Sequence, residues 1–255
     1  MRNLASVAIV LAALSLAGYG FSVDDPQQAT VAMQSMTVAQ LEKAGDNCRA
    51  QKDYEQAIKY FKEALQRESK NTGLYNKLGL AELSSGDYVA ARSDFTKATK
   101  YDRRFPDAWN NLGAVDYLQK NYGAAAKYFR KAIALEETRA AFHVNLGVTS
   151  FNQHQLERAM QEYTRALELD PEVLLHSSSA GVAARVTTRE ERAKLDYMIA
   201  RIYARMGDVE NCLECLKKAK ENGFADLKNV YKQDEFLRLR QDPRLAEIVP
   251  PPPVK

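Results

Sequence analysis

The hexamer WNNLGA (Trp109–Ala114) recurs in altered form elsewhere in the chain. YNKLGL (Tyr75–Leu80) stands 34 residues before it, and HVNLGV (His143–Val148) stands 34 residues after it. A fixed period of about 20 to 50 residues is the mark of an architecture built from stacked repeats. The sequence therefore predicts a series of 34-residue units, which begin at Val38, Thr72, Pro106 and Ala140.

Four columns of like residues support this register. The eighth position of each unit is glycine, the twentieth and twenty-seventh are alanine, and the twenty-fourth is aromatic. The members are Gly45, Gly79, Gly113 and Gly147; Ala57, Ala91, Ala125 and Ala159; Ala64, Ala98, Ala132 and Ala166; and Phe61, Phe95, Phe129 and Tyr163. Small residues let two helices approach closely, and the aromatic side chain fills the space against the next unit. We assign all four columns to the core.

Each unit is expected to form two amphipathic helices, because apolar residues recur at three- and four-residue spacing on both sides of a short polar break. Four of these breaks contain a residue suited to cap the second helix: Asp53, Asp87, Asn121 and Asp208. One helix pair cannot bury its apolar face alone, so neighbouring pairs must stack.

A fifth, degenerate unit begins at Ala193 if extra residues are allowed after Pro171. From Val38 to Phe224 the chain resembles the tetratricopeptide repeat family. The resemblance implies an all-α fold: a right-handed α-solenoid of about five helix-turn-helix repeats, followed by a C-terminal capping segment.

The sequence divides into seven segments on this interpretation. They are a signal peptide or N-terminal anchor (1–21), a polar linker (22–37), four contiguous repeats (38–171), a Ser-rich insertion (172–192), the degenerate fifth repeat (193–226), a C-terminal cap (227–249) and a proline-rich tail (250–255).

The N-terminal segment has the pattern of a secretory signal. Arg2 precedes the apolar run Leu4–Ala17, and small residues follow it. We therefore expect export to the periplasm or the cell exterior. The alternative is an uncleaved anchor of a membrane-bound scaffold, because the run approaches the length that spans a bilayer. Membrane contact is expected only through this segment.

Composition and motifs argue against several functions. The net charge is +3, with 36 basic and 33 acidic residues interspersed, so no nucleic-acid-binding stripe is indicated. The three histidines share no helical face with carboxylates at metal-ligand spacing, and no phosphate-binding loop or nucleophile elbow occurs. We expect no cofactor and no enzymatic activity.

The motif CLEC (Cys212–Cys215) is the one pattern that suggests a reactive site. A Cys-x-x-Cys pair in an exported protein suggests redox chemistry. However, residues three apart on a helix have Cβ atoms roughly 5 to 6 Å apart, whereas a disulfide needs about 3.5 to 4.5 Å. Cys212 also occupies the alanine column. We interpret both as structural thiols; a local disulfide and a thiol-disulfide oxidoreductase are the alternatives.

The resemblance also implies a binding surface. In this family the first helices of successive repeats line a concave groove that holds a peptide or a partner protein. The inward positions give these candidate peptide-binding residues: Asn76, Lys77, Leu80, Asn110, Asn111, Tyr117, Asn145, Val148, Phe151 and Asn152. An asparagine amide both donates and accepts hydrogen bonds, which suits the backbone of an extended peptide.

The first repeat does not fit one variant of this groove. It offers Glu42, Lys43 and Asp46 where a clamp for a chain-terminal carboxylate needs Lys and Asn, so we expect no such clamp. A concave face that is merely solvated, with the partner bound elsewhere, is the alternative.

Overall fold

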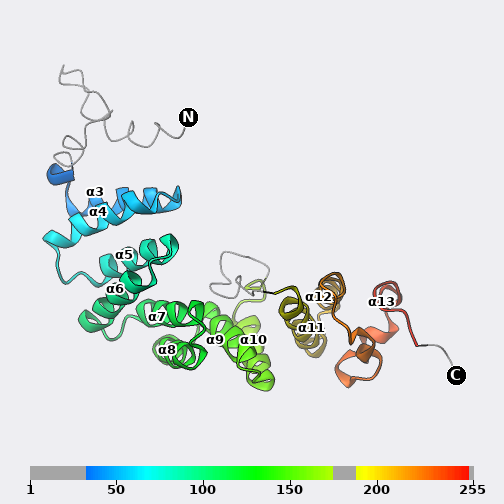
Figure 1. Ribbon diagram of the computed structural model, residues 1–255. Coiled ribbons are helices and arrows are strands. Elements are labelled where there is room, and N and C mark those ends of the chain that lie inside the picture. Colours follow the sequence, from blue (N-terminus) through cyan, green and yellow to red (C-terminus); the bar gives the residue numbers. More distant parts are fainter. Residues whose placement is uncertain (1–32, 175–187, 253–255) are drawn as a thin grey trace, which may run out of the picture. The chain divides into compact units, whose positions relative to one another are not determined.

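The computed structural model describes residues 33–174 and 188–252, and every regular element in these ranges is helical (Figure 1). The N-terminal signal or anchor and most of the Ser-rich insertion lie outside the described residues. The chain forms two compact units, Met1–Val115 and Asp116–Lys255. No helix of the described residues is long and apolar enough to cross a membrane.

The first unit contains two complete helix pairs. They are α3 (Val38–Ala50) with α4 (Tyr54–Arg67), and α5 (Thr72–Ser85) with α6 (Tyr88–Tyr101); α7 (Pro106–Leu118) then begins the third repeat. Within each pair the helices pack together, and α4 also packs against α5. The guanidinium group of Arg67 donates hydrogen bonds to the carbonyl groups of Met33, Gln34 and Met36, which fixes the segment before α3.

The second unit continues the same pattern. It contains α8 (Tyr122–Leu135), the pair α9 (Ala140–Asn152) and α10 (Leu156–Leu169), and the pair α11 (Arg189–Met206) and α12 (Val209–Glu221). Three short 3-10 turns follow, η2 (Leu227–Tyr231), η3 (Asp234–Phe236) and η4 (Leu239–Gln241), and then α13 (Pro243–Ile248).

The first helices of four repeats begin at the residues that the 34-residue period predicts, Val38, Thr72, Pro106 and Ala140. The fifth differs, because α11 begins at Arg189, one turn before Ala193. Thr188 and Glu191 form a capping box there, with each side chain bonded to the backbone of the other. Such reciprocal bonds satisfy two N–H groups of the helix start, so the helix extends to this cap.

The repeated columns form the core. All of the alanines in the twentieth and twenty-seventh columns are fully buried. A Cβ atom added to Gly79 would lie 2.7 Å from the ring of Phe95, and one added to Gly45 would lie 2.5 Å from the ring of Phe61. The aromatic side chain therefore packs directly on the glycine of its own repeat, a contact that the sequence pattern did not predict.

Three of the four predicted helix caps are confirmed. The carboxylates of Asp53, Asp87 and Asp208 accept hydrogen bonds from backbone N–H groups at 3.2, 2.9 and 3.0 Å. The prediction is wrong for Asn121, whose side chain makes no capping hydrogen bond. Its amide instead donates toward Asp116 Oδ1 at 3.5 Å.

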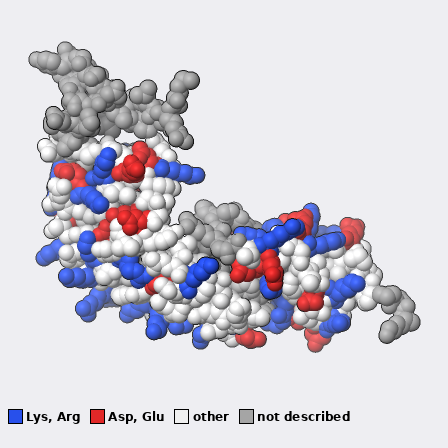
Figure 2. Space-filling model, viewed as in Figure 1, with Lys and Arg blue, Asp and Glu red and all other residues white. Residues whose placement is uncertain are grey.

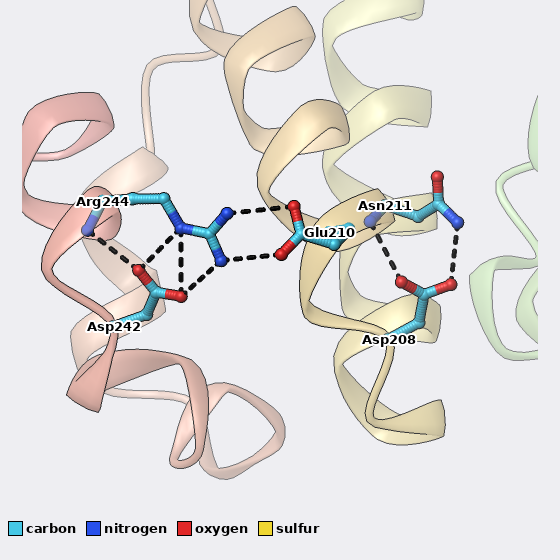
Figure 3. A network of polar contacts seen from close by, with 5 residues as sticks. All are labelled: Asp208, Glu210, Asn211, Asp242 and Arg244. Atoms are coloured by element: carbon cyan, nitrogen blue, oxygen red, sulfur yellow. Dashed lines mark hydrogen bonds and ion pairs between the residues drawn. The ribbon is translucent and has the colours of Figure 1, made fainter.

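The C-terminal segment covers the last repeat. Phe236, Leu239 and Leu245 are buried in it, whereas Leu237 is 55% exposed. Figure 3 shows how α13 is attached: Arg244 donates to both carboxylate oxygens of Glu210 on α12, at 2.9 and 2.8 Å, and to Asp242, which caps α13. This pairing lowers the pKa of Glu210.

Candidate peptide-binding surface

In the first unit, an ion-paired lysine joins two neighbouring first helices. Lys77 Nζ on α5 lies 2.7 Å from Glu42 Oε1 and 2.5 Å from Asp46 Oδ2 on α3. Burial opposes the charge, but the hydrogen bonds to Asp46 and Glu42 prevail and raise the pKa of Lys77. Because these two carboxylates already neutralise it, Lys77 is not a free cation for the terminal carboxylate of a peptide.

An asparagine pair joins the next two first helices. Asn111 Nδ2 on α7 donates to Asn76 Oδ1 on α5 at 2.8 Å. Asn110 Nδ2 lies 3.5 Å from Asn111 Oδ1, so the three amides form a short ladder. Among the described residues, the amide nitrogen of Asn76 has no hydrogen-bond acceptor. The ladder is thus positioned by its own bonds. Asn110 and Asn111 are half-buried, whereas Asn76 is only 8% exposed, so its unused donor meets a ligand only if α5 or its neighbours move to expose it.

Leu80 completes the candidate residues of the first unit. It lies one turn after Asn76 on α5, and its side chain is half-buried. The five candidate residues of this unit therefore come from neighbouring first helices, as the repeat register predicts. They are Lys77, Asn76, Asn111, Asn110 and Leu80. We call these five residues the Asn–Lys surface.

In the second unit, Tyr117 and Asn152 contact each other. Asn152 Nδ2 donates to the Tyr117 hydroxyl at 3.0 Å and to the Val148 carbonyl at 2.8 Å. Burial, and then the neighbouring Tyr122 whose ring centroid is 5.4 Å away, raises the pKa of Tyr117 to about 12. These two candidate residues form a largely buried polar contact.

The other candidate residues of the second unit are buried on α9. Asn145 is 2% exposed, Val148 is fully buried and Phe151 is 7% exposed. The register correctly gives their helix but not their burial, because a repeat pattern does not say what packs over a helix. Their role in binding stays a prediction, and it would require these side chains to become exposed.

The cysteine pair lacks the features of a redox site. Both thiols are free, and Cys212 Sγ donates to the Ala200 carbonyl at 3.2 Å. Burial raises the pKa of both Cys212 and Cys215 to about 12. The thiolate is the reactive form of cysteine, so this environment opposes nucleophilic chemistry and fits structural thiols.

His143 forms an ion pair that the sequence pattern did not predict. Its Nδ1 lies 2.8 Å from Glu162 Oε2 on α10, and its Nε2 lies 3.0 Å from the Glu137 carbonyl. Both partners are acceptors, so only the doubly protonated imidazolium satisfies both contacts. Within residues 33–174 and 188–252, no group of three His, Cys, Asp or Glu side chains could hold a metal ion.

The visible surface carries mixed charge. On the face shown in Figure 2, basic and acidic side chains are interspersed over each unit. A mixed surface of this kind offers no extended positive stripe to a phosphate backbone.

The stacked helix pairs and the short amide ladder define an α-helical repeat protein with a polar first-helix surface. Sequence models of the tetratricopeptide repeat match residues 41–98, 76–140, 140–173 and 193–222. These matches together span residues 41–173 and 193–222, most of the chain, so the chain belongs to the tetratricopeptide repeat family. No curated protein sequence matches it.

Solved tetratricopeptide repeat structures share the fold. A solved chain of MamA from Desulfovibrio magneticus RS-1, which runs from residue 41 to the end, is 22% identical, with a TM-score of 0.52 over 72% of this chain and 94% of that chain. A thermophilic repeat protein of Thermus thermophilus is 18% identical, with a TM-score of 0.52 over 83% of this chain and 98% of that chain. YrrB, described as a protein with an unusual peptide-binding site, is 18% identical, with a TM-score of 0.50 over 82% and 99%. Likeness at this level concerns the fold.

Proposed function

We propose that the chain is a noncatalytic scaffold that binds an extended segment of a partner protein on the Asn–Lys surface. The observation that carries this proposal is the Asn111–Asn76 hydrogen bond, which aligns amides from successive first helices. Family membership and the peptide-binding site reported for YrrB support the same function.

The chemistry of the surface suits a peptide backbone. Each asparagine amide offers a donor and an acceptor, the same pair that every non-proline residue of an extended peptide presents. The half-buried Leu80 supplies an apolar contact for a ligand side chain. Since Glu42 and Asp46 neutralise Lys77, recognition does not depend on the terminal carboxylate of the ligand.

Affinity measurements on variants test this function. A peptide would be selected from a random library displayed on phage, and its dissociation constant measured by fluorescence anisotropy. Each lost hydrogen bond removes roughly 0.5 to 1.5 kcal/mol, so Asn76→Ala with Asn111→Ala should weaken binding about 5- to 100-fold. Lys127→Ala, at an exposed position of α8, is the matched control and should bind as the unchanged protein does. Equal affinity of the Asn double variant would exclude this surface.

We also propose that the protein is exported, from the pattern of Arg2, the apolar run and the small residues after it. The mature chain should then begin between Gly18 and Ser22. Intact-mass measurement on protein isolated from its native cell envelope tests this. A mass that retains Met1–Ala17 would replace cleavage with the membrane-anchored alternative.

A further inference from the structure

Two buried carboxylates lie between the helices of the second repeat. Glu82 on α5 is 2% exposed and Asp94 on α6 is 5% exposed. They occupy the eleventh and twenty-third columns of the repeat. In the other three contiguous repeats these columns hold at most one acidic residue, as the pairs Cys48 and Tyr60, Asp116 and Tyr128, and Ser150 and Glu162 show.

The cations nearby neutralise this pair only in part. Lys97 Nζ on α6 lies 2.7 Å from Asp94 Oδ1, whereas Lys62 Nζ on α4 lies 3.7 Å from Glu82 Oε1, beyond hydrogen-bond distance. Both lysines are about half exposed, 59% for Lys62 and 46% for Lys97, and water screens such charges.

The remaining charged and titratable neighbours do not add a cation. Asp87, the cap of α6, contributes further negative charge. Tyr75 on α5 faces Lys97, whose Nζ lies 5.2 Å from the centroid of the ring. Two carboxylates in this position are therefore unfavourable when both are ionised.

One oxygen of the pair is buried without a partner. Glu82 Oε2 makes no hydrogen bond, although it is closed off from solvent. A buried acceptor without a partner is costly. The Asp94 carboxylate is close enough to act on Glu82 through a side-chain hydrogen bond and through its charge, so a proton on this oxygen would turn it into a donor to Asp94. Two close carboxylates commonly share one proton for this reason. Burial, and then the negative charge of Asp94, raises the pKa of Glu82 to about 8.

We propose that a proton shared by Glu82 and Asp94 holds α5 against α6, and that its loss in mildly alkaline solution loosens this helix pair and weakens peptide binding. The second half of the proposal rests on the proposed function, because α5 also carries Asn76, Lys77 and Leu80. The link is direct. Glu82 lies on the same helix as these residues and faces Lys62 of α4, which packs on α5.

Direct titration of Glu82 tests the proton. The side-chain carboxyl carbons of the full-length protein would be followed by 13C NMR, and the Glu82 signal assigned as the one missing from Glu82→Gln. The expected midpoint is about 8. A midpoint at or below the ordinary glutamate value of 4.5 would overturn the proposal.

Hydrogen exchange tests the structural consequence. The backbone amides of α5 and α6 should lose up to about 100-fold protection between pH 6 and pH 9, after correction for the intrinsic rate, because a local opening that exposes Glu82 becomes more populated. In Glu82→Gln the amide donates permanently to Asp94, so protection should stay constant. Asp116→Asn alters the same column in the third repeat, where no second carboxylate follows, and should keep the pH response of the unchanged protein. If the protection of α5 and α6 in the protein without substitutions does not change with pH, the proposal that a shared proton holds these helices together is contradicted.

Binding measurements test the coupling. The selected peptide should bind the unchanged protein about 3- to 10-fold more weakly at pH 9 than at pH 6, a coupling of ordinary size, and should bind Glu82→Gln equally at both pH values. A pH-dependent exchange with pH-independent affinity would overturn the coupling. If no peptide binds at either pH, the proposed function fails. The titration of Glu82 and the hydrogen exchange of α5 and α6 then still decide whether a shared proton holds the two helices together. If Glu82→Gln does not fold, Asp94→Asn provides the second variant.

Discussion

At the scale of single residues, the glycine and aromatic columns act as one contact. The ring of Phe95 is fully buried and lies 2.7 Å from the position that a Cβ atom of residue 79 would take. This explains why the glycine recurs even though it lowers helix propensity. Close packing leaves no room for one additional methyl group, and the aromatic ring is held on its other sides by the core.

Gly79→Ala should lower the free energy of unfolding, measured by urea denaturation. Overpacking of a core costs about 1 to 3 kcal/mol, which outweighs the gain of up to about 1 kcal/mol in helix propensity. Gly123→Ala is the control, because nothing lies within 4 Å of the added atom, and it should be neutral or stabilising. Stabilisation by Gly79→Ala would show that the contact is not tight.

The His143–Glu162 pair gives a second prediction at this scale. The hydrogen bond to Glu162 outweighs burial and, together with the Glu137 carbonyl, raises the pKa of His143 above 6.5. When folding raises the pKa of a group, that group stabilises the folded protein. The stabilisation is complete below the pKa of the unfolded state, and it is lost as the pH rises through the pKa of the folded state.

Chemical denaturation at pH 6 and pH 9 should therefore show a larger loss of stability in the unchanged protein than in His143→Gln. Any contribution of Glu82 is common to both proteins and cancels in the comparison. An imidazole signal of His143 that titrates below 6.5 in NMR would contradict the ion pair.

At the scale of elements, helix ends are stabilised by caps of unequal quality. Asp53 caps α4 with a hydrogen bond to the Gln56 N–H group at 3.2 Å, whereas Asn121 makes no such bond at the start of α8. The two residues occupy the same place in their repeats, so they form a matched pair.

Asp53→Ala should reduce thermal stability more than Asn121→Ala does. Loss of a working cap costs typically about 1 kcal/mol. Removal of Asn121 loses only its weak contact with Asp116, which is at the limit of hydrogen-bond distance. Differential scanning calorimetry on the two variants is the measurement, and a larger effect at Asn121 would be inconsistent with these caps.

At the scale of the whole molecule, the sequence is sufficient to predict the repeated part of the fold. A 34-residue period forces the same helix pair and the same small or aromatic core residue to recur, so helix positions and buried columns follow from it. The period cannot predict contacts that occur in one repeat only. Glu82 with Asp94, and His143 with Glu162, depend on residues that occur together in one repeat only.

The candidate surface shows the same division. The register places Asn76 and Asn111 on neighbouring first helices, and the structure joins them by a hydrogen bond. The register also assigns Asn145, Val148 and Phe151 to the corresponding face of α9, but in the structure these side chains are buried. Periodicity determines which way a side chain points, whereas burial also depends on what lies over it.

The central claim, that a peptide binds the Asn–Lys surface, is tested most directly by mapping the ligand with NMR. The side-chain NH₂ signals of Asn76 and Asn111 would be followed while the selected peptide is added to the full-length protein. We predict that both signals shift in a saturable way, together with backbone amides near Leu80, while the amides of α4 and α6 remain unchanged. Shifts confined to the second helices or to residues 188–252, with the Asn76 and Asn111 signals unaffected, would contradict it.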